Sequence, residues 1–191
     1  MTLREGHPGL DERTTVIAAQ EGDRDAFRLL YERYRDRVYN FIFYSIGDQL
    51  RAEDVLQIVF VKIFRGLPGF RFESSLATWI YRIALNECLN QQRKRGIQQV
   101  PFEALLGSDE EPSAAATDLQ HAESERREIV HRALMELSPK LRSVVALRYL
   151  EELSYEEIAS VLDCSAGTVA SRLNRALSQL EQQLRPLKRL L

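Results

Sequence analysis

The chain has 191 residues, of which 45% are hydrophobic and 28% charged, proportions typical of a globular protein with one large domain or two small ones. No apolar run approaches the roughly 20 residues that cross a bilayer, and the amino terminus lacks the charged start and apolar core of a signal peptide. We therefore expect a cytoplasmic protein without membrane insertion. The formal net charge of -2 does not exclude a nucleic-acid partner, because basic residues cluster locally, as at Arg93-Lys94-Arg95.

Cysteine and histidine residues are too few and too scattered to hold a metal ion. Cys88 and Cys164 lie far apart within helical patterns, and His7, His121 and His131 complete no metal-ligand spacing with them. We expect two small, half-buried thiols. The chain also shows no grouping of a nucleophile with a base, so we expect no enzyme activity, no metal and no cofactor.

A helical bundle is predicted for residues 14–95, after an amino-terminal tail of residues 1–13. Apolar residues in this bundle recur every three or four positions, which is the period of one helix face. Asp23 is expected to cap a long helix, and Gly47 to end it. Two further helices are expected before residue 95, separated by the breaker segment Gly66-Leu67-Pro68-Gly69.

Aromatic residues crowd this bundle, and two of them, Phe70 and Phe72, lie in an expected loop. The helix after the loop carries aromatic, amide and cationic side chains and ends in Gln91-Gln92-Arg93-Lys94-Arg95. Single-stranded DNA needs this combination, because unstacked bases need aromatic surfaces and phosphates need positive charge. The alternative is that Trp79 and Tyr81 are core residues and that the basic run is a solvated helix end. For Trp79 we favour the core, from which it would brace the reading surface.

Residues 96–122 predict a flexible acidic linker, because small, acidic and breaker residues dominate and little there could bury a core. Helical periodicity returns from residue 123, which predicts a second domain over residues 123–191. Ser138 and Pro139 mark the start of one of its helices. No strand pattern and no internal repeat is visible, so the predicted fold class is all-α, with two small helical domains joined by the linker.

A helix-turn-helix is predicted between Ser154 and Gln183. Ser154 and Glu157 have the spacing of a capping box, and the short turn Asp163-Cys164-Ser165 leads to a second helix capped by Ser165. The outward positions of that helix carry side chains that can contact base edges or phosphates, namely Thr168, Ser171, Arg172, Asn174 and Arg175. An ordinary helical hairpin with a solvated face is the alternative, but two caps, a short turn and a basic outer face together favour DNA binding.

The segment from Leu137 to Ala176, which includes Leu153-Ser-Tyr-Glu-Glu-Ile-Ala and Gly167-Thr-Val-Ala-Ser-Arg-Leu, resembles the fourth region of extracytoplasmic-function sigma factors, group IV of the sigma-70 family, of the sigma-E type. Asp25-Ala-Phe-Arg-Leu-Leu-Tyr, Ala52-Glu-Asp-Val-Leu-Gln and Phe72-Glu-Ser-Ser-Leu-Ala-Thr-Trp resemble parts of the second region of the same family. The resemblance implies an alternative sigma factor that binds core RNA polymerase, recognises the minus-35 and minus-10 promoter elements and directs transcription initiation.

Carried over position by position, the resemblance implies three groups of contact residues. The minus-35 element would be read by Thr168, Ser171, Arg172, Asn174 and Arg175. The minus-10 element would be read by Arg71, Phe72, Glu73, Ser74, Ser75, Thr78, Trp79, Arg82, Asn86, Asn90, Arg93 and Arg95, with Arg71 to Ser75 as the base-capturing loop. Core polymerase would bind on or near Asp54, Gln57, Phe60 and Lys62.

The implied partners are the beta-prime clamp and beta flap of core polymerase, promoter DNA and an anti-sigma protein. Two positions depart from the family pattern. Ile58 stands where an acidic residue usually follows the glutamine aligned with Gln57, so we expect a weaker or more apolar clamp contact. Ala170 stands where a basic residue often follows Gly-Thr-Val, so we expect Asn174 or Arg175 to carry more of the upstream specificity.

Two other functions remain open from the sequence. The first is a one-component DNA-binding regulator, with an amino-terminal sensor bundle, that binds operators as a dimer without polymerase. The second is a sigma-like adaptor that has lost promoter reading and binds only protein, an alternative kept open by the two departures from the family pattern.

Overall fold

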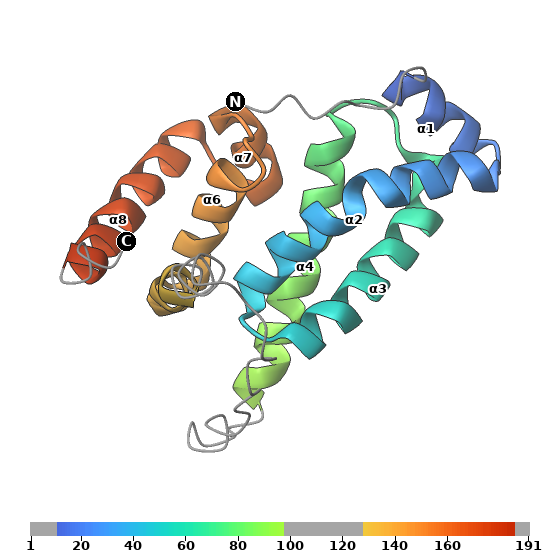
Figure 1. The fold of residues 1–191 in the computed structure, drawn as a ribbon. Helices are drawn as coiled ribbons and strands as arrows, with labels where there is room; N and C mark the ends of the chain where they lie inside the picture. Colours follow the sequence, from blue (N-terminus) through green and yellow to red (C-terminus); the bar gives the residue numbers. More distant parts are fainter. Residues whose placement is uncertain (1–10, 98–127, 186–191) are drawn as a thin grey trace, which may run out of the picture.

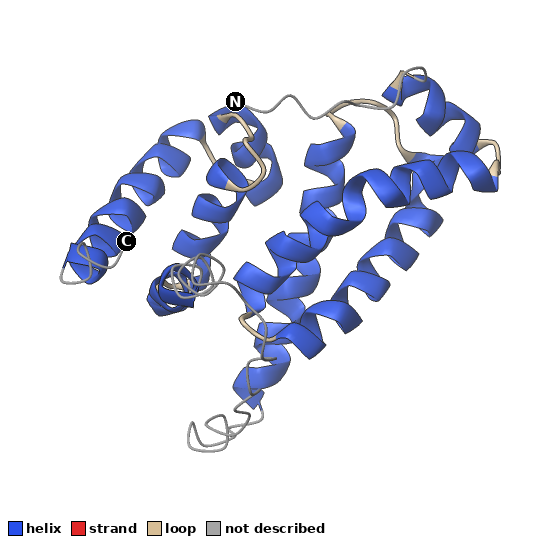
Figure 2. Ribbon diagram, viewed as in Figure 1, coloured by secondary structure: helices blue, strands red, loops and turns tan. Residues whose placement is uncertain are grey.

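The computed structural model describes residues 11–97 and 128–185, and every regular element in these two ranges is a helix (Figures 1 and 2). The amino-terminal group consists of α1 (Glu12–Gln20), α2 (Arg24–Ile46), α3 (Gln49–Gly66), the short 3₁₀-helix η1 (Leu67–Gly69) and α4 (Leu76–Ile97). The carboxy-terminal group consists of helical residues 128–136, α6 (Pro139–Tyr149), α7 (Tyr155–Leu162) and α8 (Ala166–Leu184). The all-α prediction is confirmed. None of the described helices has both the length and the apolar character that a membrane span requires.

The ends of α2 lie where the sequence predicts them. Asp23 caps the helix by accepting hydrogen bonds from the backbone N–H groups of Asp25 and Ala26, at 2.8 and 3.1 Å. Gly47 ends the helix with a φ of 79°, a left-handed conformation that glycine adopts without steric cost. A side chain at Gly47 would also collide with the sulfur of Met135, so this glycine permits a close approach of the carboxy-terminal group.

The helix α1 begins at Glu12, inside the segment predicted as a tail. Val16 is fully buried beneath it. The Gln20 side chain donates to the backbone carbonyls of Leu67 and Phe70, at 3.0 and 2.7 Å. These bonds fix α1 to the segment that leads into the predicted base-capturing loop. The predicted linker falls almost wholly outside the described residues, because α4 continues to Ile97 and the description resumes at residue 128.

Large apolar side chains fill the space between α2, α3 and α4. The ring of Phe41 meets that of Tyr81 edge-on, with 5.4 Å between the ring centroids. Burial of each such side chain stabilises the fold by about 1.5–3 kcal/mol, so this core fixes the three helices relative to one another. Its members with almost no exposed surface include Val38, Phe41, Ile42, Val55, Val59, Leu67, Ile80 and Tyr81.

The carboxy-terminal group has a core of its own, formed by α6, α7 and α8. Pro139 occupies the first turn of α6 as predicted, although the side chain of Ser138 makes no capping hydrogen bond. The buried residues that hold the three helices together include Leu137, Val144, Leu147, Ile158, Val169 and Leu173.

The two groups pack directly against each other, α4 against α7 and α2 against α6 (Figure 1). Buried residues of both groups join in one continuous apolar cluster. At one end of this junction the ring of Phe43 stacks on His131, with centroids 4.7 Å apart and an interplanar angle of 9°. The packing of the two groups therefore fixes the relative positions of the two surfaces that the sequence predicts to read DNA.

Candidate nucleic-acid interface

The predicted helix-turn-helix is formed by α7 and α8. Ser154 accepts from the backbone N–H of Glu157 at 3.2 Å, and the Glu157 carboxylate accepts from the backbone N–H of Ser154 at 2.9 Å, which completes the capping box. These bonds, with the Ser154 backbone bond as the largest cause, lower the pKa of Glu157. Asp163 makes the turn with a φ of 49°, and Ser165 caps α8 by accepting from the N–H of Thr168 at 3.1 Å.

The orientation of α8 is fixed by one buried face, which contains Val169, Leu173 and Ala176. Asn174 and Arg175 lie on the opposite, exposed face, where they are free to meet a DNA groove. Because both side chains form bidentate hydrogen bonds with purine edges, they are the residues of this helix best suited to base recognition.

The other three predicted minus-35 residues have contacts within the protein. The Thr168 hydroxyl lies 2.9 Å from that of Ser165, and the Ser171 hydroxyl donates to the Thr168 carbonyl at 3.0 Å. Arg172 is half-buried and directs one guanidinium nitrogen to the sulfur of Cys164 at 3.8 Å. Together with Lys140, Arg175 and the acidic Glu136 it lines an open groove of about 420 Å³, so basic residues outnumber acidic ones beside the exposed face of α8.

The loop of residues 71–75 contains a strained aromatic residue. Phe72 has a φ of 59°, a left-handed conformation that is rare for a bulky side chain and costs roughly 1–2 kcal/mol. Its ring lies 4.9 Å from that of Phe70, and the guanidinium of Arg13 lies 4.4 Å from the ring centroid. Strained residues are held only where the surrounding structure over-determines them, and they concentrate at functional sites.

The second helical segment to reach this loop is α1, and sequence reasoning missed its contact with the loop. Glu12 and Arg13 line a small pocket of about 180 Å³ with Phe72, Ser74 and Ser75. The expected bundle starts at residue 14, two residues after the observed start of α1 at Glu12, and this acidic residue in the first turn is the signal that could have placed the start.

Two predicted minus-10 residues support the loop from beneath. Thr78 is 1% exposed, and its hydroxyl lies 2.7 Å from that of Ser75, the residue that accepts from the N–H of Thr78 at 3.1 Å. Trp79 is half-buried, packs 5.3 Å from the ring of Phe70 and closes against Gly66. Both side chains hold the loop on the bundle, although Trp79 packs against the core and is not buried in it as expected.

The remaining predicted minus-10 residues on α4 form one exposed stripe. Arg82, Asn86, Asn90 and Arg93 recur at spacings of three or four residues, so they share a helix face. The side chain of Arg95 lies outside the described residues. Arg71 and Glu73 are exposed in the loop itself. A row of cationic and amide groups thus leads away from the loop along α4.

The predicted polymerase-contact residues on α3 are divided between two environments. Asp54 and Gln57 are exposed, whereas Phe60 is 7% exposed and packs edge-on against Tyr31 at 4.6 Å. The Lys62 ammonium is paired with Glu87 on α4. The sequence analysis singled out Ile58 on this helix but missed its other exposed apolar residues, which are Leu50, Val61 and Phe64.

Two family models match the chain. Residues 30–97 match the description "Sigma-70 region 2", and residues 127–180 match "Sigma-70, region 4". The ECF RNA polymerase sigma-E factor of Haemophilus influenzae is 36% identical over 93% of this chain and 97% of that protein. The RNA polymerase sigma-H factor of Pseudomonas aeruginosa is 36% identical over 93% and 96%, and the ECF RNA polymerase sigma-E factor of Escherichia coli K12 is 35% identical over 94% and 97%.

Solved structures show the same fold. The sigma factor RpoE in complex with the anti-sigma factor NepR from Bartonella quintana has a TM-score of 0.65 and 25% identity, over 83% of this chain and 96% of that chain. The structure of CnrH in complex with the cytosolic domain of CnrY has a TM-score of 0.68 and 24% identity, over 92% of this chain and 97% of that chain.

Proposed function

Because the chain belongs to the extracytoplasmic-function sigma factors of the sigma-70 family, we propose that it directs core RNA polymerase to promoters by reading them at two points. In this proposal α8 reads the minus-35 element, and the loop of residues 71–75 with α4 reads the minus-10 element. The observation that carries the proposal is that two surfaces suited to nucleic acids lie on the two helical groups that match the two sigma-70 regions.

At the upstream element, α8 enters the major groove with its amino-terminal turns. Ala166 and Gly167 are small enough to let the backbone approach the duplex, while Asn174 and Arg175 reach base edges. The positive charges of Lys140 and Arg172 beside this face supply phosphate attraction. Asn174 and Arg175 then carry the base recognition that Ala170 cannot provide.

At the downstream element, the loop binds a base that has left the duplex stack. The rings of Phe70 and Phe72, with the Arg13 guanidinium, form a stacking platform beside the small pocket. Removing a base from the stack costs a few kcal/mol, which a shaped pocket offsets. The stripe from Arg82 to Arg93 then follows the strand backbone and its bases along α4.

Core polymerase binds the exposed face of α3. Asp54, Gln57, Ile58 and Val61 lie on one side of this helix, and Ile58 and Val61 are 37% and 48% exposed. Exposed apolar residues rimmed by polar ones are typical of protein interfaces. Their presence supports the more apolar clamp contact that Ile58 led us to expect.

We further propose that the protein acts in the cytoplasm, has no catalytic residues of its own and leaves the chemistry to the polymerase. An anti-sigma protein is a proposed partner, since a structural relative was solved with one. Tethering two readers also raises their joint affinity, because binding of the first increases the effective concentration of the second at its element.

Gel filtration with core polymerase, followed by run-off transcription, tests this function. We expect co-elution and initiation, and we expect Val61→Glu to weaken co-elution because it adds a charge to the apolar face of α3. Glu53→Gln, an exposed change on the same helix, is the matched control. Operator binding without any polymerase association would instead support the one-component regulator, and co-elution without initiation would support the adaptor.

A further inference from the structure

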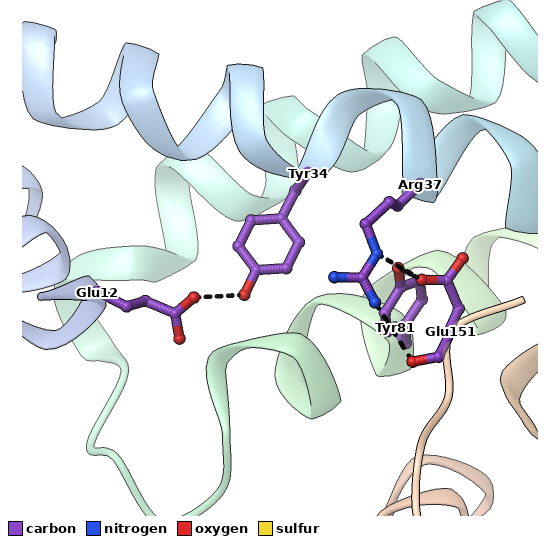
Figure 3. Close-up of polar contacts among 5 residues, drawn as sticks. All are labelled: Glu12, Tyr34, Arg37, Tyr81 and Glu151. Atoms are coloured by element: carbon purple, nitrogen blue, oxygen red, sulfur yellow. Dashed lines mark hydrogen bonds and ion pairs between the residues drawn. The ribbon is translucent and has the colours of Figure 1, made fainter. Parts of the chain in front are cut away.

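Three residues join the two helical groups through a buried polar contact, which we call the interdomain clasp: Arg37, Tyr81 and Glu151 (Figure 3). Arg37 on α2 donates from Nε to the Glu151 carboxylate at 3.0 Å and from Nη2 to the Glu151 backbone carbonyl at 3.3 Å. The Tyr81 hydroxyl on α4 donates to the same carboxylate oxygen. Glu151 follows α6, so every bond of the clasp runs between the two groups.

The carboxylate of the clasp is removed from water. The Glu151 side chain is 1% exposed, and Tyr81 is fully buried. Burying a carboxylate is strongly unfavourable unless charged and hydrogen-bonding partners compensate for the lost water. Burial raises the pKa of Glu151, although its contacts with Tyr81 and Arg37 act in the opposite direction. Both hydrogen-bond partners of the carboxylate come from the amino-terminal group. Glu151 is therefore compensated by these partners only while the groups are packed together.

The surrounding residues hold the clasp in position. Glu152 adopts a φ of 57°, a left-handed conformation for a residue other than glycine, at the point where the chain leaves α6 and Glu151 turns inward. On the other side of Arg37, the Tyr34 hydroxyl donates to Glu12 at 2.7 Å, and Arg33, which Figure 3 does not draw, pairs with the same carboxylate at 3.3 Å. Glu12 is thus satisfied by other partners, and Arg37 is left to Glu151.

A second set of contacts covers the proposed minus-10 surface. Ser75 donates to the Glu157 carboxylate at 3.2 Å, and Arg82 donates to both the backbone carbonyl and the hydroxyl of Ser160 at 2.8 Å. Ser75 and Arg82 are proposed readers of the minus-10 element, and both acceptor residues belong to α7. Packing of α7 on α4 thus occupies groups that the DNA strand would use.

In the packed arrangement, the two reading helices α4 and α8 also lie too close together to reach both promoter elements at once. Arg82 on α4 and Arg172 on α8 line the same groove, which has a volume of about 640 Å³. The two promoter elements, as their names state, lie about 25 base pairs apart, or about 85 Å along the duplex at 3.4 Å per pair. The 30 residues from 98 to 127 could span about 100 Å if fully extended, so the chain is long enough for the groups to separate.

We propose that the packed arrangement is a self-inhibited form of this sigma factor, held by the interdomain clasp, which must open before both promoter elements can be read. This inference rests on the proposed function for its consequence, but the closure itself is a property of the free chain. When the clasp opens, water replaces Arg37 and Tyr81 as the hydrogen-bond partner of Glu151. The separation of the two groups also uncovers Ser75 and Arg82.

The test uses the whole 191-residue chain without polymerase. Glu151→Ala removes the carboxylate, and Arg37→Ala removes its charged partner from the opposite group. Glu156→Ala and Arg35→Ala are matched controls, because both residues are exposed and lie outside the clasp. Small-angle X-ray scattering measures the radius of gyration, and fluorescence anisotropy measures binding of a single-stranded oligonucleotide that carries the minus-10 sequence.

We expect both clasp variants to increase the radius of gyration and to bind the oligonucleotide about tenfold more tightly than the unmodified chain, with both controls unchanged. The double variant should behave like either single variant, because both remove one interaction, whereas two unrelated losses of stability would add. Circular dichroism should show that helix content is retained.

Two results would overturn the proposal. An unchanged radius of gyration in both clasp variants would show that the clasp does not hold the groups together. A larger radius with unchanged oligonucleotide binding would show that closure does not inhibit reading. Failure of the unmodified protein to initiate transcription with core polymerase would count against the proposed function alone, because the scattering measurement does not depend on it.

Discussion

The upstream and downstream reading surfaces are assembled in different ways. The upstream surface is the exposed face of one helix, α8, whose cap at Ser165 and buried side at Val169 and Leu173 lie close together in sequence. The downstream surface combines α1, a strained loop and α4, and its hydrogen bond between Gln20 and the Phe70 carbonyl spans 50 positions. A local surface depends mainly on its own helix, whereas a composite surface depends on how distant segments pack.

The largest expected effect is on the free energy of unfolding, and it comes from a residue that supports the upstream surface. Leu173→Ala should lower the free energy of unfolding by about 2–5 kcal/mol, because Leu173 is 2% exposed and its loss leaves a cavity beneath α8. Leu177→Ala, one turn along the same helix but 40% exposed, is the matched control and should have little effect. Chemical denaturation provides the measurement. If the Leu173→Ala variant lost binding of the minus-10 oligonucleotide as well as binding of the upstream element, the two surfaces would form one cooperative unit.

A smaller effect tests base recognition at the upstream surface. Arg175→Ala should weaken binding to the upstream element by about 1–3 kcal/mol, since it removes a side chain that can bond a guanine edge. Ser178→Ala, exposed on the same helix, is the control. Footprinting of the polymerase complex across promoter variants measures the change. Equal losses at every promoter position would mean that Arg175 contacts phosphate and not a base.

The composite surface should respond differently from the local one. Phe72→Gly should weaken binding of the minus-10 strand by about 1 kcal/mol, because it deletes one stacking ring. The free energy of unfolding should change less than it would for an unstrained aromatic residue, because glycine relieves the φ of 59° while the ring contacts with Phe70 and Arg13 are lost. Anisotropy and thermal unfolding give the two values. A large loss of stability with unchanged binding would place Phe72 in a structural role only.

The smallest expected effect concerns pH at the junction between the groups. Burial, followed by the positive charge of Arg142, lowers the pKa of His131, whose Nε2 is buried without a hydrogen-bond partner. Because folding lowers the pKa of His131, the unfolded chain binds a proton at this residue more tightly than the folded protein does. The stability of the fold should therefore be retained above about pH 6.5 and should fall as the pH drops below it. Glu128 opposes this shift, and Tyr44 also faces the ring.

His131→Phe should keep the stack on Phe43 and remove the titration. Comparing the two proteins across pH isolates the histidine, because Glu151, whose pKa is raised, contributes stability of the opposite pH dependence in both. Parallel stability curves for the two proteins would show that His131 does not titrate in this range.

The local features could be predicted from the sequence because short-range rules determine them. The capping box at Ser154, the cap at Ser165 and the break at Gly47 each depend on residues within a few positions, and all three appear in the structure. Leu177 is an exception, because its position beside Ala176 in the apolar period of α8 predicts burial, whereas the side chain is 40% exposed.

The non-local features could not be predicted in the same way. The approach of Arg13 to Phe72, and the burial of Glu151 by Arg37 and Tyr81, depend on packing between segments that no local pattern connects. Charged residues are ordinarily placed on the surface, so the sequence alone gives no reason to bury a glutamate after α6. Only the structure therefore shows how the two helical groups are positioned relative to each other.

The most direct test of two-point promoter reading is transcription in vitro with core polymerase on a library of randomised promoters. We expect the unmodified protein to select two separate elements, Arg175→Ala to relax selection only upstream and Phe72→Ala to relax it only downstream. Selection of a single element, or loss of both elements in each variant, would contradict two-point reading.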